Sequence, residues 1–181
     1  RVIEEAQMLG HKYIITGGPP GFMDAYENAD TVKAMTDHYC EGAAAAEEHG
    51  LLVGYHNHDR DLQDVEGKLG YHYFLESTPD TVLYEADLYW VARAGLDPAA
   101  FVQEIGARGK VLHYKDGNYG GEDNVFLPAG TGEVDLLAAS KVADHVEYAA
   151  VELDRYDGDM MQAVQESYTY LTSAGIGQGT K

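Results

Sequence analysis

Basic residues are scarce in this 181-residue sequence. Twelve Lys and Arg residues stand against 31 Asp and Glu residues, which gives a formal net charge of −19 at pH 7. Proteins that bind nucleic acids gain much of their affinity from Lys and Arg contacts to phosphates, and an electrostatic field of this sign repels those phosphates. The composition therefore argues against nucleic acid as a partner.

Cysteine and long apolar segments are nearly absent. Cys40 is the single cysteine, so an internal disulfide is excluded. No run reaches the roughly 18 apolar residues of a membrane-spanning helix, and the first residues lack the pattern of a signal peptide, so we expect no membrane partner. Because the chain starts at Arg1 rather than Met, we expect an upstream portion that would carry any export signal. The compartment stays open, with the cytoplasm slightly favoured.

Phosphate-binding glycine motifs are missing too. No Gly-x-Gly-x-x-Gly follows a predicted strand, and the Walker pattern Gly-x-x-x-x-Gly-Lys-Ser/Thr does not occur. These motifs are the main sequence signals of an open, nucleotide-binding α/β sheet. Their absence leaves a closed barrel as the alternative to consider.

The hydrophobic pattern alternates between short β-rich runs and longer amphipathic runs. Asp97 and Pro98 are typical of a helix start, and Gly50 is typical of a helix end. The glycine and proline stretch 17–21 predicts a loop. The predicted strands are Tyr13–Thr16, Leu51–His56, Val82–Asp87, Val111–Lys115 and Ala149–Leu153, with Asn124–Leu127 as a sixth candidate; the predicted helices are Val2–Gly10, Thr31–His49, Lys68–Ser77, Pro98–Ala107, Leu136–His145 and Asp159–Leu171.

Strands that are each followed by a helix or a long loop predict a parallel sheet of the α/β class. We expect one domain over residues 1–172, followed by a flexible tail over residues 173–181 that contains three glycines. No short internal repeat divides the chain further.

Four ionisable residues lie at or just inside the carboxyl ends of different predicted strands: His56, Asp87, His113 and Glu152. In a parallel barrel these ends converge on the mouth that holds the active site. Two imidazoles and two carboxylates form a nitrogen and oxygen donor set for one divalent ion such as Mn²⁺, Zn²⁺, Co²⁺ or Mg²⁺. Taken singly, each residue has a simpler explanation as a hydrogen-bonded loop anchor, but together they predict a metal site.

The residues around these positions also resemble a known family. The motifs are Gly54-Tyr55-His56-Asn57-His58-Asp59, Asp87-Leu88-Tyr89-Trp90, Ala94-Gly95-Leu96-Asp97-Pro98, Leu112-His113-Tyr114-Lys115-Asp116, Gly130-Thr131-Gly132-Glu133-Val134-Asp135 and Val151-Glu152. In this order they resemble the xylose isomerase-like TIM barrels, specifically the sugar phosphate isomerase/epimerase group. The resemblance covers about residues 6–171 and implies a (β/α)8 barrel with one divalent metal held at the strand ends.

The resemblance places Asp87, His113 and Glu152 at metal-ligand positions, and His56 where many members have a glutamate. Sugar epimerases of this group use two metal-bound glutamates as the acid/base pair, and only Glu152 is present here. Two further positions depart from the family pattern: Trp90 stands where a histidine commonly follows the aspartate, and Tyr119 stands where the resemblance implies an arginine. The His-Asn-His form looks more like the branches with inosose dehydratase-like and keto-glycoside lyase-like proteins.

For the chemistry, Glu152 is predicted to be both a metal ligand and the base. His58, two residues after His56, is either the second acid/base or a hydrogen-bond partner that orients His56 or a substrate hydroxyl. Lys115 is a candidate to stabilise a developing oxyanion; the alternative is a salt bridge to Asp116 or another neighbouring carboxylate.

Two aromatic residues complete the predicted site. Trp90 and Tyr89 are candidates for an apolar wall against a sugar ring, and ordinary packing is the simpler alternative for both.

The family barrel has eight strands, whereas five or six are predicted here, and the first two βα units have no counterpart. An open barrel exposes strand edges, so we expect either an upstream segment or another copy of the chain to close it.

Three classes of function stay open. They are a metal-dependent sugar isomerase, epimerase or lyase; an apurinic endonuclease on the same barrel, which the net charge disfavours; and a non-catalytic sugar-binding barrel. The strand-end cluster favours the first, with a keto-sugar or sugar phosphate as the substrate.

Overall fold

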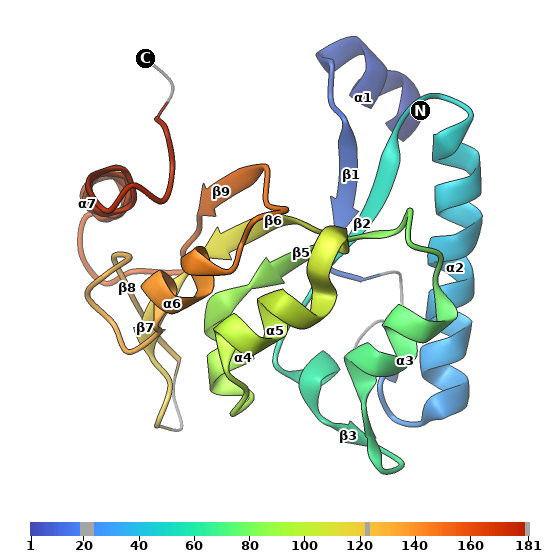
Figure 1. Cartoon of the computed structure of the whole chain (residues 1–181), viewed down its shortest axis with the longest axis horizontal. Helices are drawn as coiled ribbons and strands as arrows, with labels where there is room; N and C mark the ends of the chain where they lie inside the picture. The colour runs from blue at the N-terminus through green and yellow to red at the C-terminus, as the bar shows by residue number, and fades with distance from the viewer. Residues whose placement is uncertain (19–23, 122–123, 180–181) are drawn as a thin grey trace. The chain divides into compact units, whose positions relative to one another are not determined.

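The computed structural model describes residues 1–18, 24–121 and 124–179. The last three residues of the predicted loop at 17–21, and the last two residues of the predicted tail, lie outside this described part. The chain divides into two compact units, Arg1–Glu85 and Ala86–Lys181, and each is described by itself. Along the colour gradient of Figure 1, the first unit runs from blue to green and the second from green to red.

The first unit contains parallel strands in the order β1-β2-β5. Ile14 of β1 pairs with Val53 of β2, and His56 of β2 pairs with Glu85 of β5. Its strands are β1 (Tyr13–Thr16), β2 (Leu52–His56) and β5 (Leu83–Asp87), with the hairpin of β3 (Asp64–Val65) and β4 (Lys68–Leu69); its helices are α1 (Val2–Leu9), α2 (Ala29–Glu47), the 3-10 turn η2 (Arg60–Leu62) and α3 (Gly70–Ser77).

Local signals explain where α2 begins and ends. Asn28 and Thr31 form a reciprocal capping box at its start, which satisfies backbone N–H groups that have no partner inside the helix. Gly50 follows the helix with a φ of 69°, a left-handed conformation that glycine adopts without steric cost. The predicted helix at 31–49 is therefore confirmed with its bounds shifted by about one turn or less.

An aromatic cluster forms the core of the first unit. Tyr55 of β2 stacks on Phe74 of α3 at 4.6 Å, and it meets Tyr39 of α2 edge-on at 5.4 Å and Tyr84 of β5 at 5.6 Å, measured between ring centroids. All four side chains are almost completely buried. Offset and edge-to-face aromatic pairs add stabilisation beyond area burial alone, so this cluster fixes β2 and β5 against the helices.

The second unit contains β6 and β9 as parallel neighbours, with Val111 paired to Tyr148 and His113 to Ala150. The last two residues of β5, Ala86 and Asp87, also belong to this unit. Its strands are β6 (Gly109–Tyr114), β7 (Asp116–Asn118), β8 (Val125–Leu127) and β9 (Tyr148–Val151); its helices are α4 (Leu88–Arg93), α5 (Pro98–Ile105), the 3-10 turn η3 (Gly106–Arg108), α6 (Leu136–Lys141) and α7 (Met160–Ser173).

The five predicted parallel strands are confirmed, and three details differ. The sixth candidate, Asn124–Leu127, is wrong as a parallel strand, because β8 pairs antiparallel with β7 in a separate hairpin. The helix predicted to reach His145 ends at Lys141. A helix that the sequence pattern did not predict, α4, follows β5 directly, because the Asp87 carboxylate caps it through the backbone N–H groups of Tyr89 and Trp90.

The loop between β8 and α6 is organised by one buried carboxylate. Asp116 is 1% exposed, and its two oxygens accept hydrogen bonds from the backbone N–H groups of Gly117, Gly130, Gly132 and Val134 at 2.8–3.1 Å. Gly132 is required here, since a Cβ at this position would lie 2.3 Å from the Asp116 carboxylate. Asp116 therefore stabilises the loop, and it is not the salt-bridge partner that the sequence suggested for Lys115.

Across the described ranges, no helix combines the length and apolar character that a membrane crossing requires.

Candidate active site

Three of the four predicted metal ligands lie together in the second unit. Asp87 ends β5, His113 lies in β6, and Glu152 directly follows β9. Each offers one ligand atom, and these atoms lie within 4.8 Å of one another. The shared position at the carboxyl ends of parallel strands is where α/β barrels carry their active sites.

The two oxygens of Asp87 have different roles: one caps helix α4, and the other faces the candidate metal site. Oδ1 accepts the backbone N–H groups of Tyr89 and Trp90 at 3.0 and 3.1 Å, which fixes the carboxylate as the N-cap of α4. Oδ2 lies 3.7 Å from His113 Nδ1 and 3.5 Å from Lys115 Nζ. Because the side chain is fully buried and the cap holds it in place, Oδ2 points to a defined position.

Lys115 follows β6 and is 1% exposed. Its ammonium lies 2.6 Å from Glu152 Oε2, 2.5 Å from Asp154 Oδ2 and 3.5 Å from Asp87 Oδ2. Burial opposes the charge, but the attraction of these carboxylates outweighs it and raises the pKa of Lys115. The lysine therefore stays charged at neutral pH, and its partners include Asp154, which was not in the predicted set.

Two aromatic rings also lie close to this ammonium. The Trp90 ring lies 4.9 Å and the Phe126 ring 5.0 Å from Lys115 Nζ, measured to ring centroids, which is within range of a cation–π attraction. Tyr89 is fully buried, packs on Phe126 at 5.0 Å, and donates its hydroxyl to the Asn118 carbonyl. Trp90 and Tyr89 thus lie in the first turn of α4 and pack within this unit; contact with a sugar stays a prediction for both.

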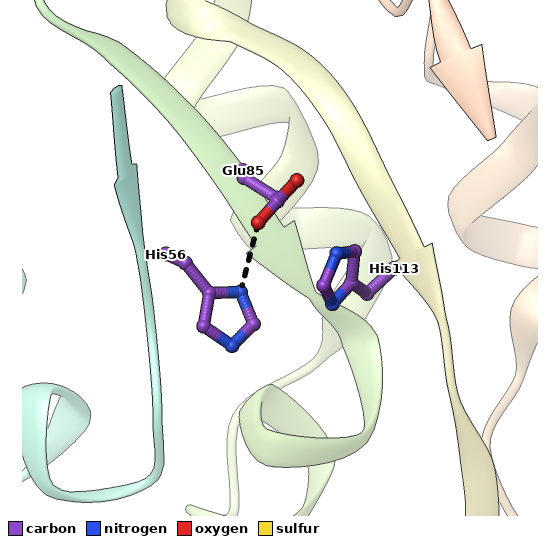
Figure 2. A group of neighbouring side chains, drawn as sticks. All are labelled: His56, Glu85 and His113. Atoms are coloured by element: carbon purple, nitrogen blue, oxygen red, sulfur yellow. Dashed lines mark ion pairs between the residues drawn. The ribbon is translucent and has the colours of Figure 1, made fainter. Parts of the chain in front are cut away.

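The predicted residues of the first unit form a histidine pair beside a carboxylate. His56 Nδ1 lies 3.3 Å from Glu85 Oε2, and both side chains are 14% exposed (Figure 2). The His58 ring meets the His56 ring edge-on at 4.9 Å. Glu85 was missed by the sequence reasoning. The available signal was its spacing of two residues before Asp87, because side chains at that spacing in a strand share one face.

The backbone of His58 is fixed by a buried acid, Asp61. Asp61, which is fully buried in the turn after β2, accepts the His58 backbone N–H at 2.7 Å through Oδ2. Burial raises the pKa of Asp61 from 3.8 to about 7, with hydrogen bonds from Tyr55 and from the His58 backbone opposing the shift. Asp61 therefore fixes the backbone that carries His58 and titrates near neutral pH.

The raised pKa predicts a pH-dependent stability that Asp61→Asn should remove. Below about pH 4, Asp61 is protonated in both the folded and the unfolded chain, and no penalty arises. As the pH rises to about 7, only the unfolded chain releases this proton freely, so the free energy of unfolding falls. A shift from 3.8 to about 7 corresponds to roughly 4 kcal/mol.

The measurement is urea unfolding of the native chain and Asp61→Asn between pH 4.5 and 8. We expect Asp61→Asn to be the more stable protein above pH 7 and to lose this part of the pH slope, because the amide keeps an acceptor for His58 without a charge. Asp80→Asn, an exchange at an exposed position of the first unit, is the control and should keep the slope. Equal slopes for the native chain and Asp61→Asn would show that the Asp61 carboxylate is not penalised by burial.

The donor set in the second unit fits a divalent ion. It consists of two carboxylates and one imidazole within 4.8 Å, a combination that zinc and manganese accept in catalytic sites. His56 belongs to the other unit, where it pairs with Glu85, so its membership in a four-ligand site stays a prediction. Asp87, His113 and Glu152 are the residues that could hold the ion.

Comparison with known proteins gives similarity in structure only. No protein-family model matches the sequence, and neither does any curated protein. Among solved structures, a sugar phosphate isomerase/epimerase from Parabacteroides distasonis ATCC 8503 matches with a TM-score of 0.84 and 23% identity, over 97% of this chain and 62% of that one.

Two further structures extend the comparison. An IOLI protein with a bound zinc atom matches with a TM-score of 0.72 and 20% identity, over 96% of this chain and 66% of that one. The probable 3-DHS dehydratase AsbF from Bacillus anthracis matches with a TM-score of 0.69 and 12% identity, over 95% of this chain and 67% of that one.

The present chain spans less than two thirds of the length of two Parabacteroides distasonis structures that it matches. Similarity at these identities supports the fold alone. The alternating strands and helices, the five parallel strands and these structural matches agree with the resemblance found in the sequence motifs. The chain therefore has the fold of the xylose isomerase-like TIM barrels and contains five parallel strands of that (β/α)8 architecture.

Proposed function

We propose that this protein is a sugar isomerase or epimerase that depends on a divalent metal and acts on a keto-sugar or sugar phosphate through an enediolate. One observation carries the proposal: Asp87, His113 and Glu152 offer ligand atoms within 4.8 Å of one another at the carboxyl ends of parallel strands. The structural matches to a sugar phosphate isomerase/epimerase and to a zinc-binding IOLI protein support this class.

Residues of the second unit supply most parts of the proposed reaction. When bound, a divalent ion polarises a sugar carbonyl and makes the neighbouring C–H more acidic. Glu152 takes this proton, since its side chain is 29% exposed and reachable from solvent. Lys115 stabilises the negative charge that develops on the substrate oxygen, because its raised pKa keeps it protonated. His58 is proposed, on the sequence argument, to return the proton.

A metal-dependent lyase or dehydratase is the second candidate. An enediolate that expels a β-leaving group gives elimination in place of isomerisation, with the same base and the same metal ligands. The structural match to a probable dehydratase and the His56-Asn57-His58 motif favour this alternative. The product of the first active substrate separates the two reactions.

The deciding experiment combines metal binding with proton exchange. We expect calorimetric titration of the chelator-treated protein with Mn²⁺, Zn²⁺, Co²⁺ and Mg²⁺ to show binding of one ion. NMR of keto-sugars and keto-glycosides in deuterated water should then show metal-dependent C–H exchange for at least one substrate. Binding without exchange on any substrate would favour the non-catalytic sugar-binding alternative, and no binding would contradict the proposal.

We expect Asp87→Asn to weaken metal binding by more than about 10-fold, since even residues that only support metal ligands contribute 10–100-fold. The amide keeps an oxygen for the α4 cap but loses the charge. Asp97→Asn is a matched control, because Asp97 caps α5 through the backbone N–H groups of Ala99 and Ala100 at 2.8 and 3.1 Å. Calorimetry on both variants tests this, and equal losses of affinity would remove Asp87 from the ligand set.

The binding partners predicted from the sequence are part of the same proposal. A small-molecule sugar is the proposed ligand, and the charge of −19 disfavours nucleic acid. A second copy of the chain or an upstream segment is proposed to cover the open strand edge. Light scattering on the purified protein measures the oligomeric state directly.

A further inference from the structure

The charged cluster of the second unit contains one more carboxylate than the candidate metal ligands. Lys115 Nζ contacts oxygens of Asp87, Glu152 and Asp154, whereas the group that could hold a metal consists of Asp87, His113 and Glu152. Three carboxylates and one ammonium leave two negative charges when the histidine is neutral. This charge matches a divalent ion, provided that the ammonium does not occupy the same oxygens.

The ammonium and a divalent ion compete for the same atoms. Lys115 Nζ lies 2.6 Å from Glu152 Oε2 and 3.5 Å from Asp87 Oδ2, and both oxygens belong to residues that could hold the ion. Like charges at such separations repel strongly where water is excluded, and Lys115 is 1% exposed. Because the Lys115 side chain is buried in this arrangement, the ammonium needs another partner within the cluster when an ion takes these oxygens.

We propose that Asp154 is a positioning residue that gives the Lys115 ammonium a partner outside the metal-ligand set, so that a divalent ion can replace the ammonium at the oxygens of Asp87 and Glu152. This inference rests on the proposed metal-dependent function. Asp154 Oδ2 lies 2.5 Å from Lys115 Nζ, and Asp154 is not part of the candidate metal group. With Asp154 present, an ion takes the oxygens of Asp87 and Glu152 while the lysine keeps a full ion pair.

The surroundings of the ammonium support the same division. Trp90 and Phe126 present their rings to Lys115 at 4.9 and 5.0 Å, and these attractions use no carboxylate oxygen. Asp154 follows Glu152 by two residues, so a short segment after β9 carries one metal oxygen and one lysine partner. Lys115 therefore has three partners that are not candidate metal ligands, namely Asp154, Trp90 and Phe126. These contacts leave the oxygens of Asp87 and Glu152 available to an ion.

The test is a double-mutant cycle read out as metal affinity. Calorimetry with Mn²⁺ and with Zn²⁺ is carried out on the native protein, Asp154→Asn, Lys115→Met and the double variant. We expect Asp154→Asn to weaken binding by about 10-fold or more, the size seen for residues that support metal ligands, because Lys115 then stays on Glu152. Lys115→Met should bind at least as tightly as the native protein.

The double variant distinguishes positioning from simple charge attraction. If Asp154 acts through Lys115, the double variant and Lys115→Met should bind the metal with affinities that differ by less than about 2- to 3-fold, roughly the error of such measurements. If Asp154 only attracts the cation, the loss persists in the Lys115→Met background, and the inference is overturned. Asp157→Asn removes a carboxylate from the same loop and is the matched control, with unchanged affinity expected. Thermal unfolding of each variant confirms that it is folded.

Failure of this inference differs from failure of the proposed function. Equal affinities of the native protein and Asp154→Asn overturn the positioning role alone. A native protein that binds none of the four divalent ions overturns the proposed function, and the positioning role with it.

Discussion

Glu152→Gln is expected to lower the rate of C–H exchange on the responding keto-sugar by about 10²–10⁴-fold, the usual cost of removing one positioned base. The amide keeps an oxygen that faces the metal position, but it cannot accept the substrate proton. Metal content should therefore fall only modestly while turnover collapses. Single-turnover exchange in deuterated water, together with elemental analysis, measures both effects on one sample.

Two companion variants sharpen this prediction. Glu147→Gln removes a carboxylate that pairs with Lys110 at 3.5 Å, before β9 begins, and should leave exchange unchanged. His58→Ala should reduce the rate substantially with the metal retained if His58 is the second acid/base. Near-normal exchange by Glu152→Gln would show that the base lies elsewhere.

Asp116→Ala is expected to cause a large loss of stability. It removes the acceptor for four backbone N–H groups, and those of Gly117 and Val134 belong to buried residues. At about 1–3 kcal/mol for each buried donor left without a partner, these two alone predict a loss of roughly 2–6 kcal/mol. Urea unfolding followed by circular dichroism measures this free energy.

Asp116→Asn separates the hydrogen bonds from the charge. The amide keeps one carbonyl oxygen, so its loss of stability should be smaller than that of Asp116→Ala. Asp144→Asn, an exchange at an exposed residue of the same unit, should change stability by less than about 0.5 kcal/mol. A loss for Asp116→Ala no larger than that of Asp144→Asn would refute the role of Asp116 in ordering the loop.

The sequence alone determined the order of the elements. Short β-rich runs predicted β1 with its observed bounds and the other parallel strands within three residues, because burial and side-chain alternation are local properties of a strand. Asp97 was predicted to start a helix, and its side chain accepts hydrogen bonds from backbone N–H groups at the start of α5. Capping depends on residues within one turn, so the local sequence contains the whole signal.

The partners of the charged side chains were decided only by the tertiary structure. The sequence placed Asp87, His113 and Glu152 at strand ends, but it left the partner of Lys115 open between Asp116 and other carboxylates. In the structure Lys115 contacts Asp87, Glu152 and Asp154, while Asp116 binds the loop backbone instead. These three partners are 28, 37 and 39 positions from Lys115 in the sequence, and no local pattern encodes contacts over such separations.

The same reason explains Glu85 and Asp61. In the sequence, Glu85 is an ordinary strand residue. Only the register of β2 and β5 places it beside His56. Asp61 reads as a polar turn residue until packing buries it completely and raises its pKa to about 7. Hydrophobic periodicity specifies which elements form, but the environment of an ionisable group depends on which elements pack against it, and only the folded chain determines that.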